Sequence, residues 1–151
     1  MGRKSEVNPA KVFLRRYLGL TARVDALARA INQAMERAFN IGVTMKEIQV
    51  LSSPSISDPM AENVCNAVDA MDALYSEKAQ AENALREILT AIDAVPDERQ
   101  KAVLTMRYVN GCPFPEIAER MHFSEPAIYV AHGRALVTVN RWLERRTFQN
   151  S

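Results

Sequence analysis

Residues 111–136, GCPFPEIAERMHFSEPAIYVAHGRAL, have the pattern of a helix-turn-helix. Ile117 and Ala118 form the apolar side of a short first helix, and the small Ala118 lets a second helix cross closely. Residues 122–124 interrupt the pattern, and the Ser124 hydroxyl can cap the helix that follows. The apolar residues of this second helix are Ile128, Ala131, Ala135 and Leu136. In such a unit the second helix commonly lies in the major groove of DNA.

Helical patterns flank the motif on both sides. Pro96 ends a long helical pattern, and Asp97 can cap the next helix, which Gly111 ends. The second helix of the motif is predicted to continue to about Arg145. Its apolar stripe continues through Leu136, Val139, Trp142 and Leu143. The motif is therefore expected to belong to a larger helical domain, residues 96–151.

The first part of the chain, residues 1–95, is predicted to form a long helical hairpin. Apolar residues recur at alternating steps of three and four over residues 9–50 and 59–95, while residues 52–58 (SSPSISD) have the composition of a loop. An antiparallel pairing of the two helical segments would bury both stripes. The heptad-like spacing also fits the interface of a homo-oligomer, and the sequence leaves both alternatives open. No period-two alternation occurs, so an all-α fold is predicted.

Charge is distributed unevenly along the chain. Residues 1–46 carry +6, residues 47–96 carry −7 and residues 97–151 carry +2, within a net charge of +1. The basic beginning can contact nucleic acid, or it can pack beside the acidic middle and neutralise it in part. A charge of +2 is small for a DNA-binding domain, so tight binding without a partner is not expected.

Several protein classes are disfavoured by the sequence. It has no apolar run of about 20 residues and no leader-like start. Its two cysteines lack a C-x-x-C spacing. Together these features predict a cytoplasmic protein. It has no glycine-rich phosphate loop and no nucleophile–base set, so an enzyme and a cofactor are not expected. His122 and His132 match no zinc pattern, so no metal is expected. They are interpreted as a turn residue and a surface or half-buried residue.

The second helix of the motif contains the candidate DNA contacts. Tyr129 can form a hydrogen bond or pack on a thymine methyl, Arg134 can reach phosphate or guanine, and Glu125 can accept from cytosine or only favour the helix dipole. Arg120, Arg141, Arg145 and Arg146 can contact phosphate, although the last three lie near the end of the helix and also suit its dipole and solubility. The predicted DNA-binding residues are Ser124, Glu125, Ala127, Tyr129, Val130, Arg134, Arg120, Arg141 and Arg145.

From Pro96 onward, about 50 residues resemble region 4 of bacterial sigma factors. The matching elements are Leu104-x-x-Arg107-Tyr108-x-x-Gly111, Glu116-Ile117-Ala118-Glu119, and Ser124 opening a helix that contains Arg134-Ala135-Leu136. The chain is also similar to small phage and prophage proteins related to the RinA and ArpU late-transcription regulators. That similarity includes residues 121–124, Ile128-Tyr129, His132 and Ala135-Leu136; in the N-terminal part it is one of pattern only.

The resemblance implies a regulator of phage late genes with double-stranded DNA and RNA polymerase as partners. It places Glu125, Ala127, Tyr129, Val130 and Arg134 at DNA-facing positions. Two other functions remain open: a module that binds polymerase without binding DNA tightly, and the small subunit of a phage terminase.

Two residues depart from the usual helix-turn-helix. His122 stands where many such units have glycine, so it must adopt an unusual backbone conformation. Pro113 stands where a serine or threonine cap is usual, so the first helix of the motif lacks that hydrogen bond.

Overall fold

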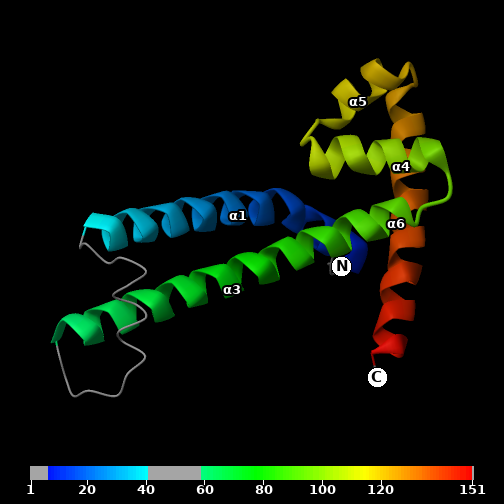
Figure 1. The fold of residues 1–151 in the computed structure, drawn as a ribbon. Helices are drawn as coiled ribbons and strands as arrows, with labels where there is room; N and C mark the ends of the chain where they lie inside the picture. Colours follow the sequence, from blue (N-terminus) through cyan, green and yellow to red (C-terminus); the bar gives the residue numbers. More distant parts are fainter. Residues whose placement is uncertain (1–6, 41–58, 151) are drawn as a thin grey trace, which may run out of the picture. The chain divides into compact units, whose positions relative to one another are not determined.

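The computed structural model describes residues 7–40 and 59–150, and every regular element within these ranges is a helix (Figure 1). The helices are α1 (Pro9–Asn40), α3 (Pro59–Asp93), α4 (Glu98–Leu104), the π-helix η1 (Thr105–Val109), α5 (Phe114–Met121) and α6 (Glu125–Gln149). The all-α prediction is confirmed. The predicted loop, residues 52–58, lies outside the described residues. No described helix is both long enough and apolar enough to cross a membrane.

The middle of the chain, residues 22–82, forms one compact unit. It contains the second part of α1 and the first part of α3, and its buried residues are Leu27, Ile31, Val64 and Ala81. Arg23 and Glu77 form an ion pair with an N–O distance of 3.6 Å. This pairs an early position of the unit with a late one, as an antiparallel arrangement requires. The predicted antiparallel hairpin is confirmed within the described residues, and residues 41–50 of its predicted first arm lie outside them. Helix α1 continues through Gly19 without a break.

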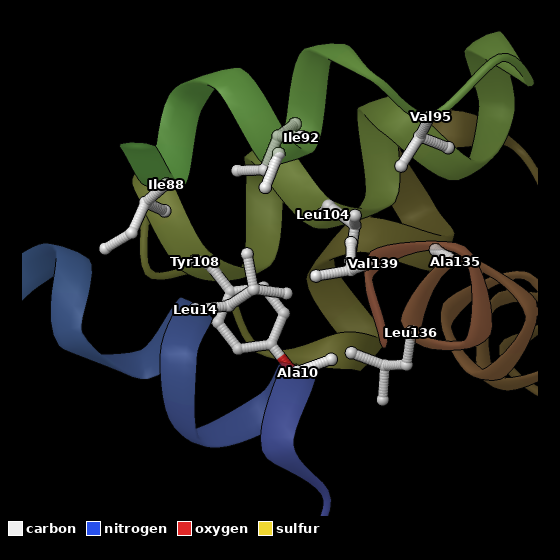
Figure 2. Packing of buried hydrophobic residues seen from close by; sticks show 11 residues of the cluster. Ala10, Leu14, Ile88, Ile92, Val95, Leu104, Tyr108, Ala135, Leu136 and Val139 are labelled. Atoms are coloured by element: carbon white, nitrogen blue, oxygen red, sulfur yellow. The ribbon is translucent and has the colours of Figure 1, made fainter. Parts of the chain in front are cut away.

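The other compact unit combines residues 1–21 with residues 83–151. Its main core takes residues from the start of α1, the end of α3, α4, η1 and α6 (Figure 2). Leu14, Ile88, Leu104 and Val139 have no exposed surface or almost none. The chain therefore divides by packing at 21/22 and 82/83. The predicted division into functional domains, residues 1–95 and 96–151, stays a prediction.

Two asparagines fasten the start of α1 to α6. Asn8 Oδ1 accepts hydrogen bonds from the Ala10 amide (3.1 Å) and from Asn140 Nδ2 (3.0 Å). Asn140 Oδ1 also accepts from the Ala10 amide, at 2.9 Å. Amide groups at the first turn of a helix have no partner within the helix, and here two side chains supply one.

A second apolar cluster joins α4, α5 and α6. Its buried residues are Val103, Cys112, Ile117, Ala118, Ile128 and Ala131. Ile117 and Ile128 are fully buried and come from the two helices of the motif. This cluster holds the predicted helix-turn-helix together, and it lies in the same compact unit as the main core.

A buried hydrogen bond connects the π-helix to α6. Tyr108 Oη lies 2.7 Å from His132 Nε2, and the two rings are stacked with centroids 5.7 Å apart. His132 is only 6% exposed, so the expectation of a surface or half-buried histidine was wrong. The reason is the partner: Tyr108 satisfies the imidazole inside the core, and the sequence does not show that these two residues meet.

Burial lowers the pKa of His132 to about 4, and the positive charges of Lys11, Arg107 and Arg15 act in the same direction. In the unfolded chain this imidazole titrates near 6.5. Between these values the unfolded chain binds a proton that the folded chain does not, so the free energy of unfolding falls as pH decreases. The full loss is reached below about pH 4 and amounts to roughly 3 kcal/mol.

We expect the double variant Tyr108→Phe/His132→Leu to show a smaller loss of stability than the wild type between pH 6.5 and 4. Both polar partners are removed together, so no buried polar group is left unpaired. Urea denaturation followed by the fluorescence of Trp142, the only tryptophan, reports on this unit. Equal pH dependence in the two proteins would contradict the role given to His132.

Candidate nucleic-acid interface

The turn between α5 and α6 has the geometry that its sequence predicts. His122 adopts the left-handed conformation, with φ 58° and ψ 39°. The Phe123 amide donates to the Ala118 carbonyl at 3.0 Å, and the His122 amide donates to the Glu119 carbonyl at 3.3 Å. This double closure is the usual end of a helix with a left-handed residue after it. The prediction that His122 carries an unusual backbone is confirmed.

Ser124 begins α6 as its N-cap. The Ser124 hydroxyl oxygen accepts a hydrogen bond from the Ala127 amide at 3.3 Å. Pro113 occupies the corresponding position before α5 and forms no side-chain cap, as predicted. The start of α5 is stabilised in another way: Arg107 Nη1 donates to the Cys112 carbonyl at 3.3 Å, and its guanidinium carbon lies 4.3 Å from the Phe114 ring centroid.

The first turns of α6 expose most of the predicted DNA-binding residues. Tyr129 is 50% exposed and Val130 is 54% exposed. Glu125 and Arg134 are exposed as well, whereas Ala127 is half-buried. Burial of Ile128, Ala131, His132, Ala135 and Leu136 on the opposite side fixes which side of α6 remains free.

The Tyr129 ring has a defined support. Its centroid lies 4.7 Å from that of Phe114, with the two rings tilted by 35°. Phe114 in turn packs edge-on against His132, with centroids 5.0 Å apart. Since aromatic pairs prefer such offset or edge-on geometries, the contact with Phe114 fixes the orientation of the Tyr129 ring. The position of Tyr129 is therefore coupled to the buried Tyr108–His132 pair.

The predicted phosphate contacts differ in their surroundings. Arg141 and Arg145 are exposed on α6, and Arg134 lies on the same side of the helix at a spacing of seven and four residues. Arg120 is exposed but forms an ion pair with Glu116 at 2.9 Å. The basic row along α6 thus consists of Arg134, Arg141 and Arg145. Arg120 would have to break its ion pair with Glu116 before it could bind a phosphate.

Two other arginines, Arg146 and Arg99, make contacts that their sequence positions do not predict. Arg146, also considered for phosphate binding, forms an ion pair with Glu87 and packs on Trp142, with its guanidinium carbon 5.6 Å from the ring centroid. Arg99 was missed: its guanidinium carbon lies 4.1 Å above the Phe123 ring, beside the turn of the motif. Only tertiary packing reveals the pairing of Arg146 with Glu87 and of Arg99 with Phe123, since these partners are distant in sequence.

No group of three or more histidine, cysteine or acidic side chains within residues 7–40 and 59–150 could hold a metal ion. Outside the helix-turn-helix, a groove lies between the end of α3 and the segment formed by α4 and the start of η1. It is lined by Leu89, Thr90, Ile92, Asp93, Lys101 and Thr105. Leu89 is 44% exposed, and Lys101 forms an ion pair with Asp93 at 3.6 Å. The groove thus combines an apolar side chain with a charged pair.

Substitution of His122 by glycine should stabilise the turn. A side chain in the left-handed region is strained, and glycine removes that strain, so His122→Gly should raise the free energy of unfolding by about 1 kcal/mol. Gly111 also has a left-handed backbone, with φ 72°, and is already a glycine. Gly111→Ala should therefore lower the free energy of unfolding by a similar amount. Denaturation curves of the two variants measure both effects; a loss of stability in His122→Gly would refute the assignment of strain to this turn.

Comparison with known families agrees with this geometry. Residues 85–144 match the family model for sigma-70, region 4. The match includes the end of α3, all of α4, η1 and α5, and most of α6. Neither a search of curated proteins nor a search of solved structures found a match. The helix-turn-helix of this chain therefore lies in a sigma-70 region 4-like domain, which indicates a role in DNA binding and transcription.

Proposed function

We propose that the protein is a sequence-specific DNA-binding transcriptional regulator of phage late genes that acts with RNA polymerase. The observation that carries the proposal is the exposed start of α6, held by a buried apolar cluster at the corner of a sigma-like helix-turn-helix. A recognition helix must keep one side free for base edges while its other side is packed, and α6 meets both conditions. The resemblance to the RinA and ArpU regulators supports the late-gene role and a cytoplasmic site of action.

The charge of the domain supports the need for a partner. Arg120 is paired with Glu116, and Arg146 is paired with Glu87, so two of its cations are compensated inside the protein. The exposed basic row on α6 consists of Arg134, Arg141 and Arg145. Phosphate contacts supply most of the affinity for DNA, and this row provides only a few of them. We therefore expect the protein to bind DNA together with polymerase or with a second copy of the chain.

A second candidate function is a module that binds RNA polymerase without binding DNA tightly. The groove beside Leu89 and Lys101 favours it, because an exposed apolar side chain next to an ion pair suits a protein partner. Recovery of polymerase subunits by the immobilised protein, together with no shift of any duplex at moderate salt, would support this candidate over the first.

Removal of Tyr129 and Arg134 together should weaken sequence-specific DNA binding at least tenfold. Each side chain is exposed at the proposed interface, and one good base contact is worth about 1–3 kcal/mol. The measurement is a titration of a duplex selected from a random pool by the full chain with polymerase. The control is Arg29→Ala/Tyr75→Ala, which removes the same two residue types from exposed positions of residues 22–82. Unchanged affinity of the Tyr129/Arg134 variant would refute this interface.

Loss of Arg141 or Arg145 should weaken binding to all duplexes alike. If each arginine neutralises one phosphate, Arg141→Gln or Arg145→Gln should reduce the slope of log affinity against log salt by about one unit. Arg37→Gln is the control, since Arg37 is an exposed arginine in the last turn of α1. A slope that does not differ from that of the wild type would remove the arginine concerned from the phosphate contacts.

A further inference from the structure

The exposed side of α6 near its start is mainly apolar. Pro126, Val130 and Gly133 are all exposed, and their spacing of four and three residues places them on one side of the helix. Tyr129 lies next to them and is half exposed. Resting on the DNA binding proposed above, we propose that these four residues form an apolar recognition surface that binds thymine methyl groups in the major groove.

The hydrogen-bonding groups of this segment support that specificity. Bidentate recognition of guanine uses arginine or lysine, and bidentate recognition of adenine uses asparagine or glutamine. Residues 125–133 contain none of these four types. His132 is buried and bonded to Tyr108, which leaves Glu125, the Tyr129 hydroxyl and, directly after this segment, Arg134 as the polar groups available to bases.

Among the four bases only thymine offers a methyl group in the major groove. An apolar side chain that approaches base edges therefore distinguishes thymine from cytosine without any hydrogen bond. Glu125, a carboxylate acceptor, can supplement this by accepting from the amino group of cytosine or adenine. The predicted target thus contains thymines opposite Val130 and Tyr129, with an amino group near Glu125.

The surface is rigid before DNA arrives. Valine in a helix is restricted largely to one rotamer, so Val130 loses little freedom on contact. The Tyr129 ring rests on Phe114, and the Arg107 guanidinium packs on Phe114 as well. A preordered surface loses less conformational entropy on binding, so even small methyl contacts can contribute to specificity.

Gly133 gives a second, independent observation. Glycine inside a helix is less stable than alanine, yet a Cβ atom at Gly133 would meet no atom within 4 Å. Its φ is not in the left-handed region, so the backbone does not require glycine either. Packing among the described residues thus gives no reason for glycine here. A close approach of DNA to the α6 backbone supplies one, because the missing side chain leaves room for it.

Replacement of thymine by uracil tests the methyl contacts directly. A duplex is first selected from a random pool by the full chain with polymerase, and each thymine is then replaced by uracil, which removes the methyl and keeps every hydrogen-bonding group. We expect about a fourfold loss of affinity for each methyl that is buried on binding. In Val130→Ala, which removes the contacting side chain, the same replacement at the facing position should have a smaller effect.

The outcomes separate this inference from the proposed function. Equal affinity for thymine and uracil duplexes would overturn the methyl contacts while sequence-specific DNA binding stands. A pool from which no duplex is enriched would contradict the proposed function itself, and the inference with it. A selected site without thymine opposite α6 would also overturn the inference.

Gly133→Ala tests the close approach, with Gly19→Ala as its matched control. Gly19 also lies inside a helix, and a Cβ atom there would likewise meet nothing within 4 Å. Both variants should have a higher melting temperature than the wild type, but only Gly133→Ala should bind the selected duplex more weakly. If Gly133→Ala binds as well as Gly19→Ala, Gly133 does not belong to the apolar recognition surface and the inference of close approach is overturned.

Discussion

The hydrogen bond between Tyr108 and His132 is the constraint on which the proposed interface depends. Both side chains are buried, and each polar group would be left unsatisfied without the other. The bond holds the side of α6 that carries His132 toward the core. Since the helix cannot rotate without breaking it, the opposite side, with Val130 and Gly133, remains free. The π-helix η1 supplies Tyr108, and such helices occur often at functional positions.

From this bond an aromatic stack continues to the surface. His132 packs against Phe114, and Phe114 packs against Tyr129, so one buried contact orients an exposed side chain. The guanidinium group of Arg107 also packs on Phe114 and donates a hydrogen bond to the Cys112 carbonyl. Two features of the motif reduce stability locally, the left-handed His122 and the helical Gly133. Only Gly133 has a physical explanation in the proposed contact with DNA.

The electrostatics are consistent with a recognition domain that depends on a partner. The exposed cations of α6 form a single row, while Arg120 and Arg146 are paired with glutamates. Affinity from phosphate contacts is therefore limited, and methyl contacts add specificity more than affinity. The groove beside Leu89, proposed above as a surface for a protein partner, lies in the same compact unit.

Features of this protein that depend on near neighbours could be predicted from its sequence. The cap at Ser124, the left-handed His122, the uncapped Pro113 and the cap at Asp97 were all predicted, because each involves groups within a few residues. The apolar spacing likewise predicted the two long helices and the buried sides of α5 and α6. The sigma-like character followed from these local patterns, and the family match over residues 85–144 agrees with it.

Features that depend on distant partners could be identified only in the folded protein. The burial of His132 required Tyr108, 24 positions earlier, and the pairing of Arg146 required Glu87 on another helix. The start of α1 is hydrogen-bonded to α6 through Asn8 and Asn140, and the compact units divide at 21/22 and 82/83. The physical reason is the same in each case: a polar group can be buried only where a partner meets it, and sequence spacing does not show which distant residues meet.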